Sequence, residues 1–293
     1  MTKIICIGEV LWDKLPNGLY IGGAPLNVAT NLRSFDIDAQ IISAVGDDEL
    51  GRKAVQILAN KGFNTNYLQI NTSSTGLVEV ELNSDGIPSY CIKEPVAWDF
   101  IEWNSSINTI TQNADYICFG SLAQRNEVSQ KTILKVLEHT TAKRIFDLNI
   151  RAPYYDFDII HESLILTDIL KINDEELELL LRQKGKVLEE KEAVQYLQKE
   201  YDLDMVIITK GEKGAVVLDG EIWCESPGIN TIVKDTVGAG DAFLAAFIFG
   251  FITYKNKTHK TLNFANHIGA FVASKDGATP ELSKEINELL IKC

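Results

Sequence analysis

The sequence of 293 residues has few cysteines, no excess of basic residues and no long hydrophobic run. Its cysteines are scattered and contain no C-x-x-C pair, which argues against both a disulfide framework and a structural zinc site. The longest apolar stretch, residues 242–252, is well short of the roughly 18 residues that a membrane span needs. The apolar run after Lys3 is too short for a signal peptide. We therefore expect a cytoplasmic protein with reduced thiols.

Acidic residues outnumber basic ones by 41 to 28, and the formal net charge is -13. This balance disfavours a general attraction to nucleic acid or to an anionic membrane surface. We expect neither as a partner, and any phosphate that the protein binds must be held by a local feature.

Short β-rich runs alternate with amphipathic helical patterns along most of the chain, which predicts an α/β fold with a mostly parallel sheet and helices on both faces. Several of the runs are continuously apolar, as expected for strands covered on both faces. Asp174 is a candidate N-cap and Gly62 a candidate helix stop. Strands are expected at 3–8, 39–46, 114–120, 143–149, 168–173, 205–211 and 214–219, and helices at 24–35, 48–61, 128–140, 175–182 and 190–200.

Residues 64–103 interrupt this alternation. The pattern at 77–82 and the Asp85-Gly86 pair predict an antiparallel hairpin, and no helix of useful length fits the region. Such an insertion is either a functional lid or dimer contact, or a hairpin on the sheet edge with no such role. Val78 and Val80 are expected to be exposed there, so a homodimer through the lid strands is a further expectation.

The stretch "DTVGAGDAF" at 235–243 precedes an apolar helical run. Gly238 and Gly240 permit close approach of a ligand, and free N–H groups at a helix start suit an anion such as a phosphoryl group. Asp241, in the first turn, would accept the proton of an attacking hydroxyl, an arrangement typical of a kinase. Taken alone, the stretch fits a simple capped helix better, with Asp235 or Thr236 as the cap.

The rest of the chain changes that balance, because "DTVGAGDAF" resembles the second signature of the PfkB, or ribokinase-like, carbohydrate kinases. "GGAPLNVATNL" (22–32) resembles the first signature, and the resemblance continues through "GEVLWD" (8–13), "DLNIR" (147–151), "KINDEE" (171–176), "TKGEKGA" (209–215) and "ANHIGAFVASKDGATP" (265–280). The resemblance implies a ribokinase-like three-layer sandwich with a mostly parallel central sheet and a small β-rich lid. It further implies one domain over 1–293, with the lid contributed by about 9–22 and 64–103.

The resemblance also implies roles for single residues. Asp241 matches the catalytic base, and the backbone of Gly238, Ala239 and Gly240 matches the anion hole. Asp13, Gly23 and Asn27 match positions that hold sugar hydroxyls, although Asp13 alone would equally be a solvated loop residue. Trp98, Asp99 and Arg151 are further candidates for binding the sugar, the first two because "PVAWD" (95–99) resembles a lid segment of fructokinases.

Asn173 and Glu176 match the family motif near the ATP phosphates and Mg²⁺, although an acidic first helical turn explains them equally well. Thr209, Gly211 and Gly214 match a nucleotide loop, and Asn266 matches a residue beside the adenine. No cluster has the spacing of a permanent metal site, so Mg²⁺ is expected to arrive with ATP. Backbone carbonyls near Asp235, Val237 and Gly277 would hold a monovalent cation such as K⁺, as in some relatives.

The motifs are most similar to those of bacterial fructokinases, which implies transfer of the ATP γ-phosphoryl group to O6 of D-fructose. Ribokinases usually show "GGKGAN" where this chain has "GGAPLN", so ribose is less favoured. 2-Keto-3-deoxygluconate, another sugar or a nucleoside remain alternatives, as does a sugar-binding regulator without catalysis. A Rossmann oxidoreductase is disfavoured because Gly8-Glu9 does not supply its glycine-rich turn.

Overall fold

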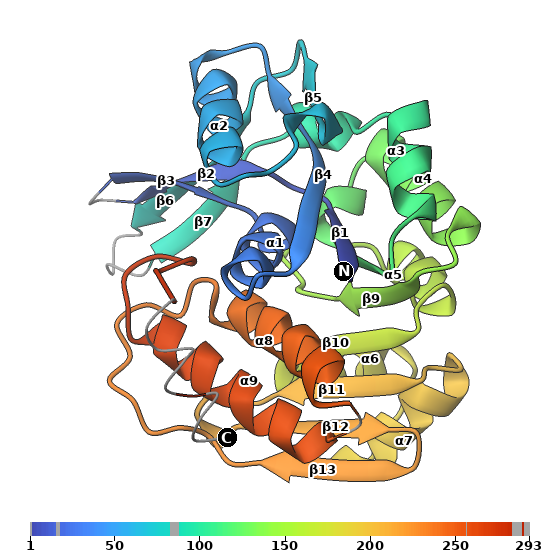
Figure 1. Ribbon diagram of the computed structural model, residues 1–293. Helices are drawn as coiled ribbons and strands as arrows, with labels where there is room; N and C mark the ends of the chain where they lie inside the picture. The colour runs from blue at the N-terminus through green and yellow to red at the C-terminus, as the bar shows by residue number, and fades with distance from the viewer. Residues whose placement is uncertain (1, 16–17, 83–87, 256, 283–288, 290–293) are drawn as a thin grey trace.

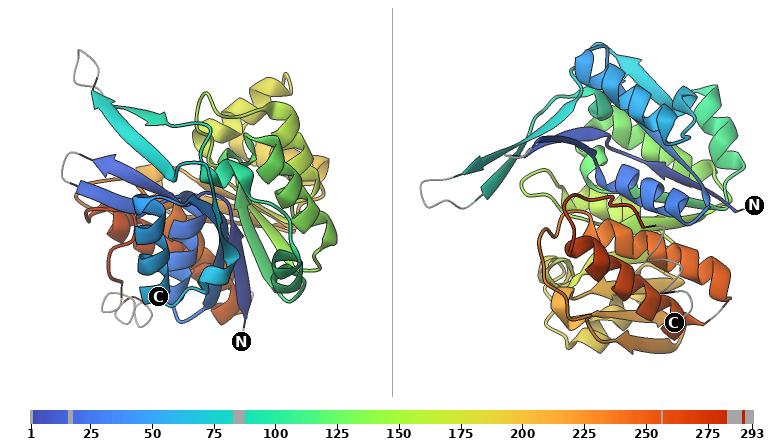
Figure 2. Two further views of the ribbon diagram at one scale, coloured as in Figure 1. Left: turned by 90° about the horizontal axis from the view of Figure 1, so that it is seen from above. Right: turned by 60° about the vertical axis from the view of Figure 1, so that its left-hand side comes forward.

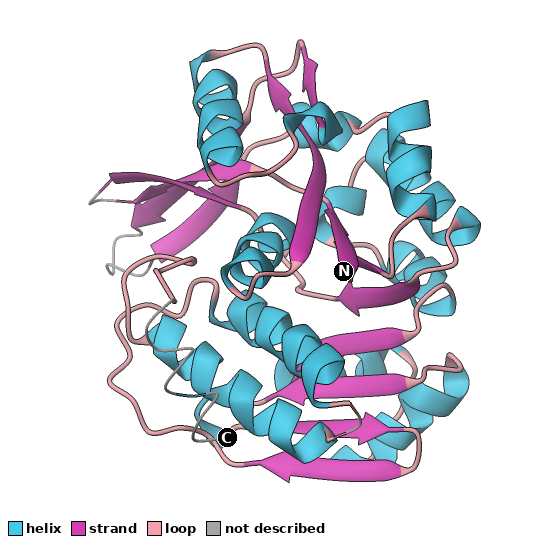
Figure 3. Cartoon of the chain, viewed as in Figure 1, coloured by secondary structure: helices cyan, strands magenta, loops and turns pink. Residues whose placement is uncertain are grey.

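The computed structural model describes residues 2–15, 18–82, 88–255, 257–282 and 289. Its strands form one nine-stranded sheet and one four-stranded sheet. Helices cover both faces of the large sheet, which gives three layers (Figures 1 and 3). The predicted α/β sandwich with a mostly parallel central sheet is therefore confirmed.

The large sheet has the order β13-β12-β11-β10-β9-β8-β1-β4-β5. All neighbours from β11 to β5 are parallel, whereas β12 and β13 are antiparallel additions at one edge. Its strands are β1 (Lys3–Ile7), β4 (Asp38–Gly46), β5 (Leu68–Asn71), β8 (Tyr116–Gly120), β9 (Lys143–Asp147), β10 (Ile169–Asn173), β11 (Met205–Thr209), β12 (Ala215–Asp219) and β13 (Ile222–Ser226).

Successive residues of the central strands belong to two separate hydrophobic cores. In β1, Ile5 and Ile7 belong to one core and Ile4 and Cys6 to the other, and all four are fully buried. This explains why the strand sequence is continuously apolar rather than alternating. The helices of the first core are α3 (Ser105–Gln112), α4 (Glu127–His139), α5 (Phe157–Ile165), α6 (Asp174–Gln183) and α7 (Glu190–Glu200), and those of the second are α1 (Ala24–Ser34), α2 (Glu49–Asn60), α8 (Ala239–Tyr254) and α9 (Thr258–Ala273).

The four-stranded sheet, called the small sheet below, has the order β3-β2-β6-β7. Its strands project away from the large sheet, as Figure 2 shows in blue and teal. Both segments expected to form a lid contribute to it, but β5 of the second segment pairs with β4 of the large sheet instead. The Asp85-Gly86 turn lies outside the described residues. The strands are β2 (Leu11–Leu15), β3 (Gly18–Gly22), β6 (Gly76–Leu82) and β7 (Pro88–Ile92).

Two local expectations about side chains are wrong. Asn173, not Asp174, is the N-cap of α6, because its side chain accepts the N–H of Glu176. Val78 is only 6% exposed rather than solvent-facing, because it belongs to the first hydrophobic core and lines the cavity described below. The side chain of Val80 lies outside the described part of the structure. The stop at Gly62 is confirmed: α2 ends at Asn60, and Gly62 has φ +80.

Candidate active site

A cavity of about 400 Å³ lies between the small sheet and the carboxyl-terminal edge of the large sheet. This edge is where open α/β sheets bind ligands, and the volume suits a small molecule. The segments after β1 and β9, the starts of α1 and α8, and strands β2, β6 and β7 all contribute to its wall. The lining residues are Glu9, Leu11, Asp13, Gly23, Ala24, Asn27, Val78, Ile92, Leu122, Asn149, Arg151, Lys171, Thr236, Val237, Gly238, Gly240 and Asp241.

Asp241 lies in the first turn of α8 and is only 8% exposed. The seven residues that follow it, 242–248, are all buried between α1, α9 and the sheet, which fixes the start of the helix at the cavity. Burial, followed by the charge of Asp147, raises the pKa of Asp241 to about 6, while the hydrogen bond from Asn27 lowers it. A carboxylate with this pKa is ionised at neutral pH and is basic enough to accept a proton.

Gly238 is the N-cap of α8, with φ +76 and no side-chain cap. A Cβ at this position would lie 2.4 Å from the Cβ of Ala278 and would need a left-handed backbone, so only glycine fits. Neither Asp235 nor Thr236 caps the helix, because the Asp235 carboxylate accepts the N–H of Val237 instead. The first N–H groups of α8 therefore have no side-chain cap and border the cavity.

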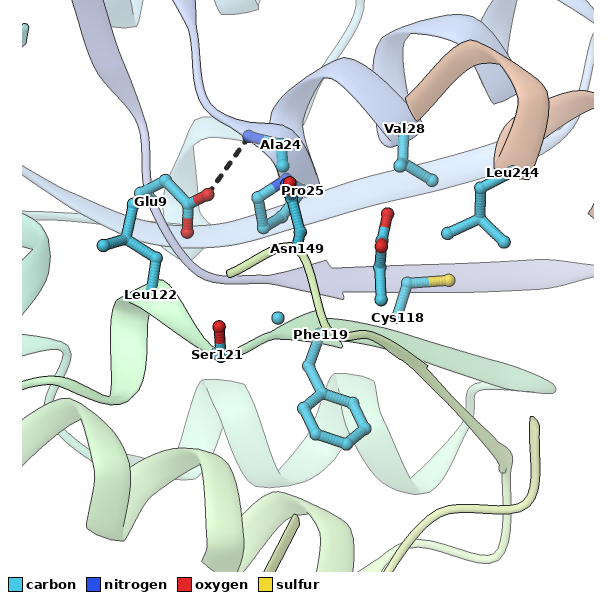
Figure 4. Close-up of a pocket in the computed structure, with 12 residues that line it drawn as sticks. Glu9, Ala24, Pro25, Val28, Cys118, Phe119, Ser121, Leu122, Asn149 and Leu244 are labelled. Carbon is cyan, nitrogen blue, oxygen red and sulfur yellow. Dashed lines mark hydrogen bonds between the residues drawn. The ribbon is translucent and has the colours of Figure 1, made fainter. Parts of the chain in front are cut away.

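Asn27 and Gly23 reach the cavity from α1. The Asn27 amide donates to Oδ2 of Asp241 over 2.8 Å. Gly23, with φ +114, allows Glu9 to lie directly beneath it, since an added Cβ would be 2.2 Å from the Glu9 carbonyl oxygen. The Glu9 side chain in turn accepts the N–H of Ala24 at the start of α1 (Figure 4).

Three carboxylates face the cavity with one arginine. Burial raises the pKa of Asp13 to about 6 and that of Glu9 to about 7, while the charge of Arg151 lowers both. The charges of Asp13, Glu9 and Asp241 are thus only partly balanced by Arg151.

Lys171 and Asp147 form a buried ion pair beneath the start of α8, with 2.9 Å between Nζ and Oδ1. A Cβ on Gly240 would lie 3.2 Å from Nζ, so the ammonium is next to the candidate anion hole. Burial opposes the charge of Lys171, but Asp147, Glu176 and Asp241 together outweigh it and raise the pKa of the ammonium. Burial therefore does not neutralise this cation, and its ammonium lies next to Gly240 while it is paired with Asp147.

Trp98 and Asp99 do not line the cavity, which corrects their expected place at the sugar. Trp98 is fully buried and Asp99 is 1% exposed. Both Asp99 oxygens accept hydrogen bonds from Arg125, because the segment folds back against the turn after β8 instead of over the cavity.

The expected nucleotide residues gather at the ends of neighbouring strands. Asn173 ends β10 and pairs with Thr209 at the end of β11. Glu176 forms a capping box with Asn173 and also accepts the N–H of Ile150, so both its oxygens are engaged in the helix start and the adjacent loop. Asn266 donates to the carbonyls of residues 226 and 227, and Gly214 lies against the same turn. Gly211 borders this group, and a Cβ added to it would meet no other atom within 4 Å.

Two loops meet where the monovalent cation is expected. Asp235 donates its N–H to the carbonyl of Ala273, and Gly238 contacts Ala278, so segments 235–238 and 273–278 lie side by side. Val237 and Gly277 belong to these two segments. Among the described residues, no group of three His, Cys, Asp or Glu side chains is arranged to hold a metal ion.

The wall residues that were not predicted from the sequence include three with charged or amide side chains, Glu9, Asn149 and Lys171. Glu9 follows β1, Asn149 follows β9 and Lys171 lies within β10, each in a motif that resembles the family: "GEVLWD", "DLNIR" and "KINDEE". Their position at the carboxyl edge of a parallel sheet was the available signal. Figure 4 shows Glu9 and Asn149 also bordering a smaller internal cavity, next to Leu122.

Comparisons with known proteins identify the family and the fold of this chain. The family model described as "pfkB family carbohydrate kinase" matches residues 2–285. A putative sugar kinase of Pyrococcus horikoshii is 30% identical over 92% of this chain and 84% of its own. Its structure in complex with ATP has a TM-score of 0.81 at 27% identity, covering 98% of this chain and 99% of that one.

A fructokinase of Escherichia coli is 28% identical over 96% of each chain. A fructokinase of Vibrio cholerae, solved with fructose, ADP and a calcium ion, has a TM-score of 0.84 at 22% identity, covering 99% of this chain and 98% of that one; this last likeness shows the fold. No helix in the described part of the chain is long and apolar enough to cross a membrane. The chain belongs to the pfkB family of carbohydrate kinases and has its ribokinase-like fold.

Proposed function

We propose that this sugar kinase transfers the γ-phosphoryl group of ATP to O6 of D-fructose, with Asp241 as the general base. The observation that carries the proposal is the position of Asp241: a buried carboxylate in the first turn of a glycine-capped helix, facing a cavity of sugar size. In this proposal Asp241 takes the proton of the sugar hydroxyl as its oxygen attacks phosphorus, and the bond from phosphorus to the β,γ-bridging oxygen breaks.

The chain's own groups would stabilise the transferred phosphoryl group. The N–H groups of Gly238 and Gly240 would face the anion, and Lys171 would add a positive charge from below. The N–H of Ala239 donates to the carbonyl oxygen of Thr236 over 3.2 Å, so its place in the anion hole would require that bond to open. Asp13, Gly23, Asn27 and Arg151 would hold the sugar, and the small sheet would act as a lid that excludes water. Water exclusion favours sugar over ATP hydrolysis.

The charge around the cavity supports a neutral sugar. Asp13 and Asp241, together with Glu9, whose pKa of about 7 leaves it partly ionised at neutral pH, outnumber Arg151, and the charge of Lys171 is balanced by Asp147. A second phosphate or a carboxylate on the substrate would face this negative wall, which is why fructose is preferred over phosphorylated sugars. The name of the E. coli relative, a fructokinase, supports the same sugar.

A second candidate is 2-keto-3-deoxygluconate, because Arg151 faces the cavity as a single cation that could bind its carboxylate. Ribose, other sugars and nucleosides have no such specific contact in their favour. A non-catalytic sugar-binding regulator is disfavoured by the complete arrangement around Asp241.

ATP would lie over the ends of β10 and β11, with Asn173, Glu176, Thr209, Gly211, Gly214 and Asn266 around it. Mg²⁺ bound to the nucleotide would neutralise charge on the phosphates, and the second lone pairs of the Glu176 oxygens suit a magnesium-bound water. K⁺ would be held by carbonyls near Asp235, Val237 and Gly277. We place the protein in the cytoplasm.

The test is a coupled assay of ATP consumption over a panel of fructose, 2-keto-3-deoxygluconate, ribose and nucleosides. We expect turnover on fructose, a loss of about 10²–10⁴ in kcat for Asp241→Asn, loss of activity with EDTA and stimulation by K⁺ over Na⁺. Turnover on no compound, or an unchanged rate for Asp241→Asn, would contradict the kinase mechanism. Turnover on 2-keto-3-deoxygluconate alone would contradict only the choice of sugar.

A further inference from the structure

Arg125 lies at the end of the turn after β8 and its side chain is only 5% exposed. It donates from Nε and Nη2 to the two oxygens of Asp99 over 2.8 and 2.9 Å. Nη2 also donates to the carbonyl oxygen of Lys93 over 2.7 Å. Asp99 accepts the N–H of Val96 as well. The ion pair therefore fixes residues 93–99, the segment by which the chain leaves the small sheet.

The guanidinium of Arg125 contacts two aromatic rings. It is 4.1 Å from the ring centroid of Trp98 and 5.1 Å from that of Tyr154. On its other side, Trp98 packs under the first residue of β6, since a Cβ on Gly76 would be 2.5 Å from Nε1 of Trp98. The start of β6 and the end of β7 therefore both contact the same cluster of Trp98, Asp99 and Arg125.

Tyr154 connects this cluster to the opposite wall of the cavity. Its N–H donates to the carbonyl oxygen of Arg151 over 2.7 Å, which closes the turn that carries Arg151. Val78 of β6 and Ile92 of β7 form a pair in the small sheet and line the cavity from above. Arg125, Trp98, Asp99 and Tyr154 do not line it themselves.

We propose that Arg125 is a positioning residue for the sugar. It sets the distance between strands β6 and β7 of the small sheet and the turn that carries Arg151, and it does not touch sugar or nucleotide. This rests on the proposed function, and it assigns the "PVAWD" segment a role as anchor of the small sheet. The planar guanidinium is essential, because only this group can bind a carboxylate with two parallel bonds and contact two aromatic rings at once.

The test compares Arg125→Lys and Arg125→Met with Arg144→Lys. Arg144 is a matched control because it forms a two-bond ion pair with Asp168, of 2.9 Å each, near the amino ends of β9 and β10 and remote from the cavity. We expect both Arg125 variants to raise the KM for the sugar on the order of tenfold or more, as displacement of binding groups does. The KM for ATP should stay within about twofold, and Arg144→Lys should lower the melting temperature while both KM values stay unchanged.

A purely structural role of Arg125 would lower the melting temperature and leave the sugar KM at the control value, and that result would overturn the proposal. Hydrogen exchange gives a second readout that needs no turnover. Amides of 76–79 and 92–99 should exchange faster in Arg125→Lys than in Arg144→Lys, and equal exchange would overturn the proposal. If the wild type turns over no sugar, the proposed function fails while this exchange test still decides the role of Arg125.

Discussion

Asn27 and Asp241 are 214 positions apart, yet their side chains are joined by a hydrogen bond of 2.8 Å. The bond joins the first turns of α1 and α8, the two helices that follow the glycine-containing signatures. It also orients the carboxylate at the start of α8. The candidate sugar ligand and the candidate base are therefore one hydrogen-bonded unit, and a change in one should be measurable in the other.

The first prediction concerns the pH dependence of activity. Because the pKa of Asp241 is about 6, kcat/KM of the wild type should decrease as the pH is lowered and the base is protonated. The half-point, at which kcat/KM is half of its maximum, should lie near pH 6. The hydrogen bond from Asn27 lowers this pKa, so Asn27→Ala should move the half-point to higher pH. Rate measurements across pH 4.5–8, about 1.5–2 units on either side, would show it.

Asn31→Ala is the matched control, because Asn31 is a buried asparagine of the same helix that donates to the Asn27 carbonyl. It should leave the half-point where it is. An unshifted half-point in Asn27→Ala would mean that Asp241 does not govern the decrease of kcat/KM at low pH.

The second prediction concerns stability and Glu9. Burial raises the pKa of Glu9 from 4.5 to about 7, so the folded state holds its proton more tightly than the unfolded state. Its contribution to the free energy of unfolding is fully present below about pH 4.5 and is lost as the pH rises through 7. Glu9→Gln should therefore gain stability relative to the wild type between pH 5 and pH 8, by at most about 3 kcal/mol.

Chemical unfolding at both pH values measures this difference. Glu138→Gln removes an exposed carboxylate from α4 and should show no comparable change with pH. A gain for Glu9→Gln that is equal at pH 5 and pH 8 would contradict a raised pKa for Glu9.

The third prediction concerns Gly238. Gly238→Ala would bring its Cβ within 2.4–2.8 Å of Ala278 in a left-handed backbone, which must displace the start of α8. We expect a kcat lowered at least about tenfold, because the N–H groups move away from the phosphoryl group. Gly185→Ala has a similar left-handed backbone, φ +63, but meets nothing within 4 Å. It should cost only about 1–2 kcal/mol of stability and no activity; equal rates for the two variants would argue against an anion hole at Gly238.

The fourth prediction concerns a homodimer through the small sheet. Val78 no longer supports it, but Leu19 and Tyr20 of the edge strand β3 are 40% and 41% exposed. Apolar side chains on an edge strand favour pairing with a second copy. Light scattering should give twice the mass of one chain, and Leu19→Lys with Tyr20→Lys should reduce it to a monomer. A wild type that is monomeric at assay and storage concentrations would contradict the dimer.

Most strands of the large sheet were predicted from the sequence, because a strand covered on both faces is largely apolar and strands β1, β8 and β11 have this pattern. Helix α3 has a polar, serine- and threonine-rich sequence and was not predicted. In the site, Asp241 and Asn27 could be selected because each lies within a glycine-containing motif. Asp99 could not be placed, because its position depends on an ion pair with Arg125, 26 residues away, which no local pattern reveals.

The site has two parts, the hydrogen-bonded starts of α1 and α8 and the small sheet, and the two parts differ in how freely their residues can be exchanged. In the proposed mechanism, proton transfer and phosphate binding would depend on two helices packed in one buried core, where most substitutions would impair catalysis. The small sheet contributes only a few apolar contacts and Asp13 to the cavity wall. New sugar preferences can therefore arise by exchange of residues in that sheet while the reaction chemistry is inherited unchanged.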